Sequence, residues 1–363
     1  MRSLFPAAIA ILATTIAPLL SMAQTAIATV PVGNTPIGVA ANPVTHKVYV
    51  VNHGSNSVTI IDGTTHATST VSVEDRPEAV VANPVTNKVY VTNAGADSVS
   101  VIDGVTNAVS ATVHVGSYPQ ALAVNTATNK IYAANNFGHS VTVIDGATNA
   151  TTTIQVGQGP RGIVLNPATN KIYTVNYGSQ DVTVIDGATG ATTSVPAGKH
   201  PWAIAVDTKS DKIYAVNEDS ASVTIIQGAT NATTTVDLGP IPFAVEVNPA
   251  TKKAYVLSYG NDTMTVIDET TDTVSKTVSL GTHSQALAID EYSDQIYVGN
   301  QRTASVTVID GKTNLPVVKV DVGAIPYAFG IDPEAHMVYV ANFSSNNVTV
   351  ILLPAGKRGV ATR

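Results

Sequence analysis

One tyrosine recurs along this chain of 363 residues at intervals of 41 or 42 residues. The repeat tyrosines are Tyr49, Tyr90, Tyr132, Tyr173, Tyr214, Tyr255, Tyr297 and Tyr339. Each interval holds four short apolar runs separated by Gly, Asn or Asp, a pattern that indicates strands rather than helices. A period near forty residues with four strands per unit is typical of a propeller blade. We therefore predict an all-β, eight-bladed β-propeller with four antiparallel strands per blade.

The first repeat shows how each blade should be built. We expect its strands at residues 37–42, 47–52, 57–62 and 68–73. The second residue of the first strand is Gly or Ala in every copy, as required where the innermost strands converge on the axis. The fourth strand is rich in Thr, which suits a solvated outer edge. The strands that carry the tyrosines are apolar on both faces and should pack between neighbouring blades.

The two ends of the repeat array predict how the ring closes. A strand-like run at about residues 27–32 precedes the first blade, and the last blade, built from residues 327–352, stops one strand short. The simplest solution is that the early run supplies the missing outer strand of the last blade. We accordingly expect one propeller domain over residues 24–353, followed by a flexible basic tail at 354–363.

The first 23 residues have the composition of a secretory signal. Arg2 precedes an apolar stretch, and Ser21, Met22 and Ala23 place small residues before Gln24. No later segment is apolar over a membrane-spanning length. We expect an exported protein that is periplasmic, secreted or at the cell surface, without a membrane span once the signal is removed.

Composition excludes several kinds of site. The chain has no cysteine, so it has neither disulfides nor thiolate metal ligands. Its net charge is −7 and only 12% of its residues are charged. This balance makes nucleic acid an unlikely partner, because such binding depends mainly on Lys and Arg at the phosphates.

The amino-acid sequence of the repeat resembles that of a known family. Residues 90–93 read Tyr-Val-Thr-Asn within NPVTNKVYVTN, and the variants NPATNKIYTVN and DTKSDKIYAVN begin at residues 166 and 207. The chain is similar to the YVTN family of β-propeller repeat proteins over essentially all of its mature length. The resemblance implies an exported or surface-associated protein of bacterial or archaeal type. It implies no single function, because such proteins include surface-layer components, periplasmic propellers, and sequence neighbours of lactonases and nucleic-acid binders.

Variation among the copies is concentrated in two sets of loops. These loops join the fourth strand of one blade to the first strand of the next, and the second strand of a blade to its third. In a propeller they share one face, around the mouth of the central channel. Eight of the ten aromatic residues outside the signal and the repeat positions fall there. They are Tyr118, Phe137, Tyr177, Trp202, Phe243, Tyr259, Tyr327 and Phe343. Such residues favour a ligand site, or else a cap on the channel or an oligomer contact.

The residue after the loop proline, or its equivalent, is expected to point toward the channel. These positions hold Ile37, Glu78, Gln120, Arg161, Trp202, Phe243, Gln285 and Tyr327. Arg161 beside Trp202 suits a carboxylate or a sugar acid; the alternative is an ion pair between Arg161 and Glu78 across the mouth. The predicted ligand-binding residues are Arg161, Trp202, Phe243, Tyr327, Gln120, Gln285, Tyr177 and Tyr259.

Catalytic candidates are few. Glu246 lies on an innermost strand where every other copy has Ala, Val or Gly, and burial there would raise its pKa. A water-filled channel would instead leave it an ordinary solvated carboxylate. The candidate catalytic residues are Glu246, Glu78, His200 and His283. The histidines show no ligand spacing, so we expect neither a metal site nor a cofactor. The recurring Ile-Asp-Gly, varied at Gln227 and Glu269, indicates a turn rather than a calcium loop.

Three classes of function follow. The first is an exported, non-catalytic binding or scaffold module, expected to be a monomer, that takes a small molecule, a glycan or a protein at the channel mouth. The second is a lactonase-like hydrolase or lyase with an acid/base or metal site at the same mouth. The third is single-stranded nucleic-acid binding, with Arg161 and the aromatic residues stacking on bases.

Overall fold

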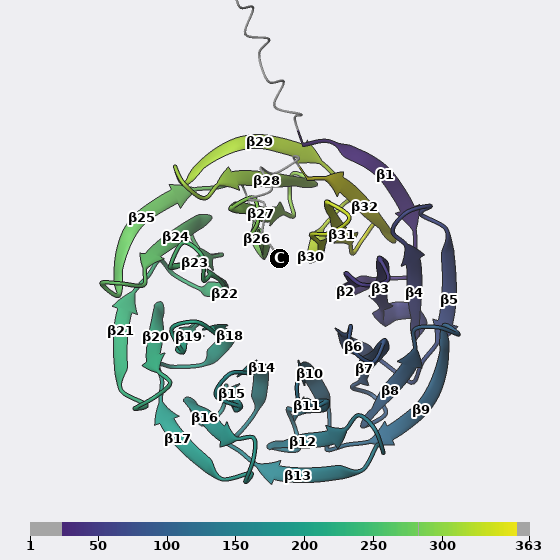
Figure 1. Cartoon of the computed structure of the whole chain (residues 1–363). Coiled ribbons are helices and arrows are strands. Elements are labelled where there is room, and N and C mark those ends of the chain that lie inside the picture. Colours follow the sequence, from purple (N-terminus) through teal and green to yellow (C-terminus); the bar gives the residue numbers. More distant parts are fainter. Residues whose placement is uncertain (1–23, 282, 354–363) are drawn as a thin grey trace, which may run out of the picture.

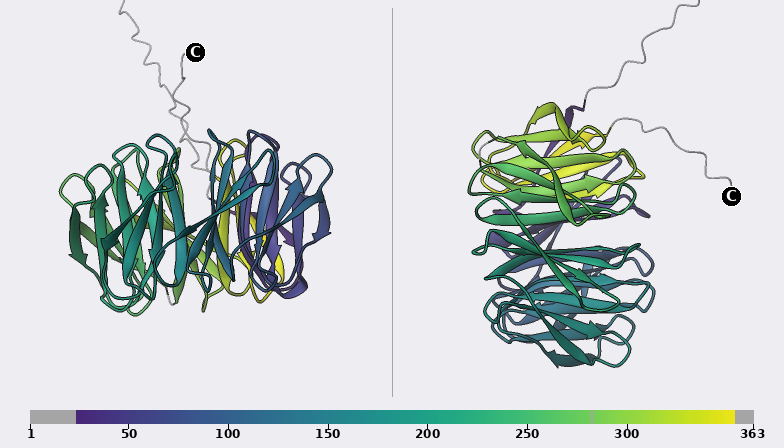
Figure 2. Two further views of the ribbon diagram at one scale, coloured as in Figure 1. Left: turned by 90° about the horizontal axis from the view of Figure 1, so that it is seen from below. Right: turned by 90° about the vertical axis from the view of Figure 1, so that its left-hand side faces the viewer.

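Eight four-stranded antiparallel sheets surround a central axis in the computed structural model, which describes residues 24–281 and 283–353 (Figure 1). The side views show a short cylinder with connecting loops at both ends (Figure 2). This confirms the predicted eight-bladed propeller. The predicted signal at 1–23 and the predicted tail at 354–363 lie outside the described residues. Within those residues, no helix has the length and apolar character that a membrane crossing requires.

The strands fall into four concentric sets. The innermost are β2 (Pro36–Asn42), β6 (Pro77–Asn83), β10 (Pro119–Asn125), β14 (Pro160–Asn166), β18 (Pro201–Asp207), β22 (Pro242–Asn248), β26 (Ser284–Asp290) and β30 (Pro326–Asp332). The second set is β3 (Lys47–Asn52), β7 (Lys88–Asn93), β11 (Lys130–Asn135), β15 (Lys171–Asn176), β19 (Lys212–Asn217), β23 (Lys253–Ser258), β27 (Gln295–Asn300) and β31 (Met337–Asn342). The third set is β4 (Ser57–Asp62), β8 (Ser98–Asp103), β12 (Ser140–Asp145), β16 (Asp181–Asp186), β20 (Ser222–Gln227), β24 (Thr263–Asp268), β28 (Ser305–Asp310) and β32 (Asn347–Leu352). The outermost are β5 (Thr68–Ser72), β9 (Ala108–His114), β13 (Thr151–Gln155), β17 (Thr192–Pro196), β21 (Thr233–Asp237), β25 (Thr273–Ser279), β29 (Leu315–Asp321) and β1 (Ala26–Pro31). A three-residue 3-10 turn, η1 (His53–Ser55), follows β3.

We number the blades along the chain, so that blade 1 is β2 to β5 and blade 8 is β30, β31, β32 and β1. Blade 8 is the closure. β1 pairs antiparallel with β32, with Val30 opposite Val348. Just before β1, the buried Gln24 donates from Nε2 to the Tyr297 hydroxyl of blade 7 at 3.1 Å. The N-terminal segment therefore completes blade 8, as the strand count predicted, and it also contacts blade 7.

The core lies in the seams between blades. All eight repeat tyrosines are at most 1% exposed, and each of the eight hydrophobic clusters joins residues of two adjacent blades. The cluster between blades 5 and 6, for example, packs Tyr214 and Val223 against Val245 and Val256. Fully burying one such aliphatic side chain contributes about 1.5–3 kcal/mol. The tyrosines are thus structural residues.

A second set of contacts crosses the seams at the face that carries the loops between first and second strands and between third and fourth strands. We call this end of the cylinder the turn face. The last residue of an inner strand donates its side-chain amide to the turn of the next blade, as Asn83 does to Asn129 at 3.0 Å and Asn166 to Asp211 at 2.7 Å. At the closure, His46 Nδ1 lies 2.9 Å from Asp332 Oδ2. The repeated Asp of the third-strand turns also accepts backbone N–H groups, which confirms the turn reading of Ile-Asp-Gly.

One seam departs from this pattern. Glu269 takes the place of the Gly found in six other turns of its kind, and Asp207 takes the place of the usual Asn. The Glu269 side chain is only 3% exposed, and neither of its carboxylate oxygens hydrogen-bonds to a described protein group. Burial, together with the adjacent Asp207, raises the pKa of Glu269 to about 7. This seam therefore holds a buried carboxyl group where six other turns have Gly.

Candidate functional site

The two variable loop sets do share one face, which we call the mouth face. Their backbones hydrogen-bond to one another within single blades, as in Gly54 N to Asn34 O at 3.0 Å and Gly138 N to Ser117 O at 3.0 Å. The residue before each inner strand has a positive φ in all eight blades, for example 51° at Arg76 and 51° at His200. The chain therefore turns sharply just before each of the eight innermost strands, which form the wall of the channel.

A β-bulge then sets the direction of the next side chains. In every blade the pairing register between the first and second strands shifts just after the first residue of the inner strand. In blade 4, Pro160 pairs with Asn176 and Gly162 with Val175, so that Arg161 between them is left unpaired. A bulge of this kind re-aims one side chain without breaking the sheet. The bulged residue is the one after the loop proline that the sequence singled out.

Seven of these eight residues line one cavity of about 250 Å³. The lining consists of Glu78, Gln120, Arg161, Trp202, Phe243, Gln285 and Tyr327, one from each blade except blade 1. The eighth, Ile37, is partly buried and packs against a hydrophobic cluster between blades 1 and 2. The cavity therefore lies at the axis and collects side chains from seven blades.

Arg161 is the only positively charged residue in the lining. The central carbon of its guanidinium lies 3.9 Å from the centre of the Trp202 ring and 4.7 Å from that of Tyr177. Its Nε is buried and hydrogen-bonds to no described protein group. No carboxylate of residues 24–281 or 283–353 forms an ion pair with it, so the alternative pairing with Glu78 is not present. Burial lowers the pKa of Arg161, but a guanidinium stays charged.

Aromatic rings extend the wall on either side of Arg161. Trp202 meets Tyr177 edge-on at 6.0 Å between ring centres and lies 5.1 Å from Phe243. Tyr177 in turn stacks on His200 at 4.2 Å with the planes 7° apart. The His200 Nδ1 is 2.6 Å from Asp219 Oδ2. Blades 4 to 6 thus supply a continuous aromatic surface that fixes the position of the guanidinium.

The other side of the cavity is acidic and polar. Burial raises the pKa of Glu78, while His53 and Arg76 act in the opposite direction. The His53 Nδ1 is 3.7 Å from Glu78 Oε1 and 3.1 Å from the Pro77 carbonyl. Burial, and to a smaller extent the charge of Glu78, raise the pKa of Tyr327, and both side chains line the cavity. The lining therefore has a cationic, aromatic half and an anionic, hydrogen-bonding half.

The remaining predicted site residues do not reach the cavity. Tyr177 contacts the Arg161 guanidinium from outside the lining, and Tyr259 contacts His283, with 3.3 Å between the Tyr259 hydroxyl and Nδ1. His200 and His283 are each held by a neighbouring side chain outside the lining. The predicted ligand-binding set is thus divided, with Arg161, Trp202, Phe243, Tyr327, Gln120 and Gln285 in the lining.

Glu246 lies farther along β22, toward the turn face. Its side chain is exposed to the channel, while the surrounding strands and the nearby Glu291 raise its pKa to about 7. Accessibility and a raised pKa are compatible, because a narrow channel admits water but limits the solvation of a charge. Glu78 is the single catalytic candidate in the cavity. Across residues 24–281 and 283–353, no three His, Asp or Glu residues form a group that could hold a metal ion.

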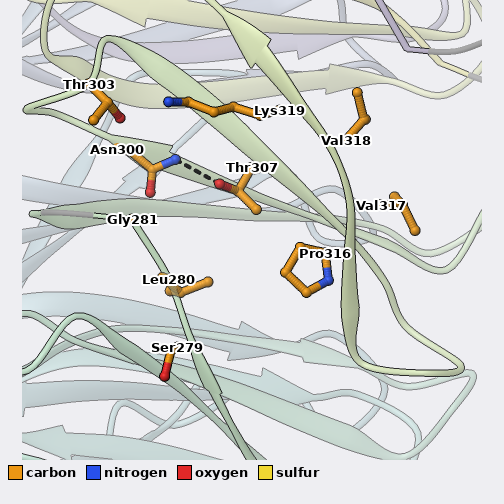
Figure 3. Close-up of a pocket in the computed structure, with 10 residues that line it drawn as sticks. All are labelled: Ser279, Leu280, Gly281, Asn300, Thr303, Thr307, Pro316, Val317, Val318 and Lys319. Carbon is orange, nitrogen blue, oxygen red and sulfur yellow. Dashed lines mark hydrogen bonds between the residues drawn. The ribbon is translucent and has the colours of Figure 1, made fainter.

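A second hollow of about 400 Å³ lies at the rim of blade 7 (Figure 3). Its walls come from the end of β25 and from β27, β28 and β29, and Asn300 Nδ2 donates to Thr307 Oγ1 at 2.8 Å within it. Lys319 is the only titratable residue in its lining. It brings together no acid/base pair and no aromatic surface, so it is a weaker candidate site than the channel mouth.

Sequence reasoning missed two features of the mouth. The bulge that presents each lining residue was not foreseen, although the proline followed by one variable residue in seven blades was a signal for it. The contact between His53 and Glu78 was not foreseen either, because the two residues come from different blades and no spacing in the sequence relates them.

Comparison with known proteins establishes the fold. No protein-family model and no curated protein matches the sequence. Among solved structures, the chain is similar to a chain of Kuenenia stuttgartiensis hydrazine synthase, with 19% sequence identity and a TM-score of 0.62. The match covers 88% of this chain and 96% of that chain. At this level of identity, the likeness shows that both chains are β-propellers.

Proposed function

We propose that this protein is an exported binding module whose ligand occupies the cavity at the channel mouth. The proposal rests on one observation. Arg161 lines the mouth cavity with its guanidinium over the Trp202 ring, and it forms no salt bridge with any carboxylate of the described residues. Holding a charge in such a place costs free energy unless it is paired, so a residue of this kind is characteristic of a ligand site.

The variation among blades supports the same proposal. The inner strands end in Asn or Asp in all eight blades at the turn face, whereas the bulged residues at the mouth include an acid, a base, two amides and three aromatic rings. A cap on the channel would be served by eight similar apolar residues. A mixed lining is instead what a small ligand needs for both contact area and orientation.

Trp202 provides a direct test, because it is the only tryptophan in the chain and lies in the cavity lining. Its fluorescence should change in a saturable manner when a ligand binds. We would titrate the protein with neutral sugars, sugar acids, amino acids and short peptides, and compare Phe243→Ala with Phe137→Ala. Phe137 is 66% exposed on the same face but outside the lining, so its loss should leave binding intact. Emission that is indifferent to every class of compound would contradict the proposal.

Acid/base catalysis at the mouth is a second candidate, favoured by the raised pKa of Glu78 and by His53 at 3.7 Å. A carboxyl group with a raised pKa beside an imidazole can serve in proton transfer. Hydrolysis of sugar lactones or esters that is lost in Glu78→Gln and retained in Glu74→Gln would establish it. If the protein only binds its ligand, neither the parent nor either variant should hydrolyse these compounds.

A further inference from the structure

We infer that the ligand of the mouth cavity is a compact ring-shaped hydroxy acid, bound through its carboxylate by Arg161 and through its hydroxyl groups by Glu78 and the two glutamines of the lining. This inference rests on the proposed function and specifies the chemical class of its ligand. It is argued from three properties of the lining.

The first property is the geometry of Arg161. Its guanidinium lies over the Trp202 ring, and the N–H groups of a guanidinium lie in its own plane. Nε is buried, whereas the terminal N–H groups form no hydrogen bond with a described protein group and are available to a ligand. Two parallel N–H groups match the two oxygens of a carboxylate, which makes a carboxylate the best partner for a pre-oriented arginine.

The second property is the polar half of the lining. Apart from Glu78, its hydrogen-bonding side chains are the neutral amides Gln120 and Gln285 and the hydroxyl of Tyr327. Gln285 is itself oriented, because its Oε1 accepts a hydrogen bond from Gln301 Nε2 at 2.5 Å. Amides both donate and accept, as hydroxyl groups do. A carboxyl group among amides and a phenol hydroxyl can likewise hydrogen-bond to the hydroxyl groups of a ligand.

The third property is the size and shape of the cavity. About 250 Å³ admits a single small ring rather than a chain of several sugars or a folded peptide. The faces of Trp202 and Phe243 offer an apolar surface against which the C–H face of a saturated ring can pack. A six-membered sugar acid presents all three features together, a carboxylate, hydroxyl groups and an apolar ring face.

The test uses the full mature protein and Trp202 fluorescence, with D-galacturonate as the probe and D-galactose as its match without the carboxylate. Galacturonate should bind at least 10-fold more tightly than galactose. Arg161→Gln should weaken galacturonate binding by about 10- to 100-fold, which corresponds to the loss of a hydrogen-bonded charge pair. Arg161→Lys keeps the charge but not the planar fork, and should still lose about 10-fold. The control is Arg302→Gln, an exposed arginine on the same face, which should bind like the parent.

The outcomes separate this inference from the proposed function. Equal binding of galactose and galacturonate, or tight binding of an amino acid in place of the sugar acid, would overturn the hydroxy-acid inference while leaving a ligand at the mouth. Galacturonate binding that survives Arg161→Gln would also overturn it. If no compound of any class alters Trp202 emission, both the inference and the proposed function fail.

Discussion

The two ends of β14 show how this protein divides construction from recognition. At the turn face, Asn166 is 1% exposed and its side chain is fully paired, donating to Asp211 and accepting from Ala168 N at 3.0 Å. At the mouth face, the buried Nε of Arg161 on the same strand has no hydrogen-bonding partner among the described protein groups. Every blade has an Asn or Asp at the position of Asn166, whereas Arg161 occurs once. A position that holds the same kind of residue in every blade, with its side chain hydrogen-bonded, stabilises the propeller. A position that varies among the blades, with its side chain left without a protein partner, is available to bind a ligand.

The largest expected effect comes from breaking the ring itself. Deletion of residues 24–33 removes β1, exposes the backbone edge of β32 and uncovers part of the core cluster around Val30. We expect the soluble folded protein to be lost, because an unpaired and flat strand edge promotes aggregation. Light scattering and circular dichroism would measure this. Ile27→Thr, at a side chain that is 45% exposed in the same strand, should behave like the parent. A deletion variant that melts like the parent would show that closure is not the main constraint.

The next effect tests the turn face. Asn166→Ala leaves Asp211 without its donor and the turn after β14 without its acceptor, which should reduce the free energy of unfolding by about 1–3 kcal/mol. Ligand binding should be unchanged, because Asn166 lies at the far end of the strand from Arg161. Chemical denaturation and the Trp202 titration would measure the two properties separately. If Asn166→Ala lowered the ligand affinity without lowering the free energy of unfolding, the turn face would take part in binding, and the assignment of a structural role to it would be wrong.

A smaller, pH-dependent effect is expected at the exceptional seam. The folded-state pKa of Glu269, about 7, lies above its ordinary value of 4.5, so the folded state holds this proton more tightly than the unfolded state does. The contribution of Glu269 therefore lowers stability as pH rises from about 4.5 to 7. Glu269→Gly, which restores the residue of six other blades, should stabilise the protein at pH 8 by roughly 1–3 kcal/mol and have little effect at pH 4.5.

Denaturant unfolding at both pH values would check this difference. Glu334→Ala removes an exposed carboxylate from another loop of the turn face and should show no such dependence on pH. A gain from Glu269→Gly that is equal at pH 4.5 and pH 8 would mean that backbone conformation, and not the buried carboxyl, makes the difference.

The fold could be predicted from the sequence because repetition supplies its own alignment. Tyr49 and its seven copies set the period, the Gly or Ala at positions such as Gly38 identified the innermost strand, and counting strands identified the closure at Val30. Each of these signals is local or periodic. The lining of the mouth could be predicted for the same reason, since one residue per blade occupies equivalent places around an axis.

Contacts between unlike positions could not be predicted. His53 approaches Glu78 across a seam, Tyr259 turns toward His283 rather than into the cavity, and Glu269 meets Asp207 between blades 5 and 6. Each depends on the rotamers and relative positions of side chains from different blades. The period fixes which blades are neighbours, but it does not fix which of their side chains touch.

The most direct test of the division between the two faces is the stability of Arg161→Met, measured by chemical denaturation beside Asn166→Ala. Methionine keeps an unbranched apolar side chain against Trp202 and removes the charge. If Arg161 serves a ligand, the cost of holding its charge at the mouth offsets the favourable contact with Trp202, and Arg161→Met should unfold within about 0.5 kcal/mol of the parent or be more stable than it. A destabilisation by Arg161→Met as large as that by Asn166→Ala would instead make Arg161 a structural residue of the ring and contradict the account.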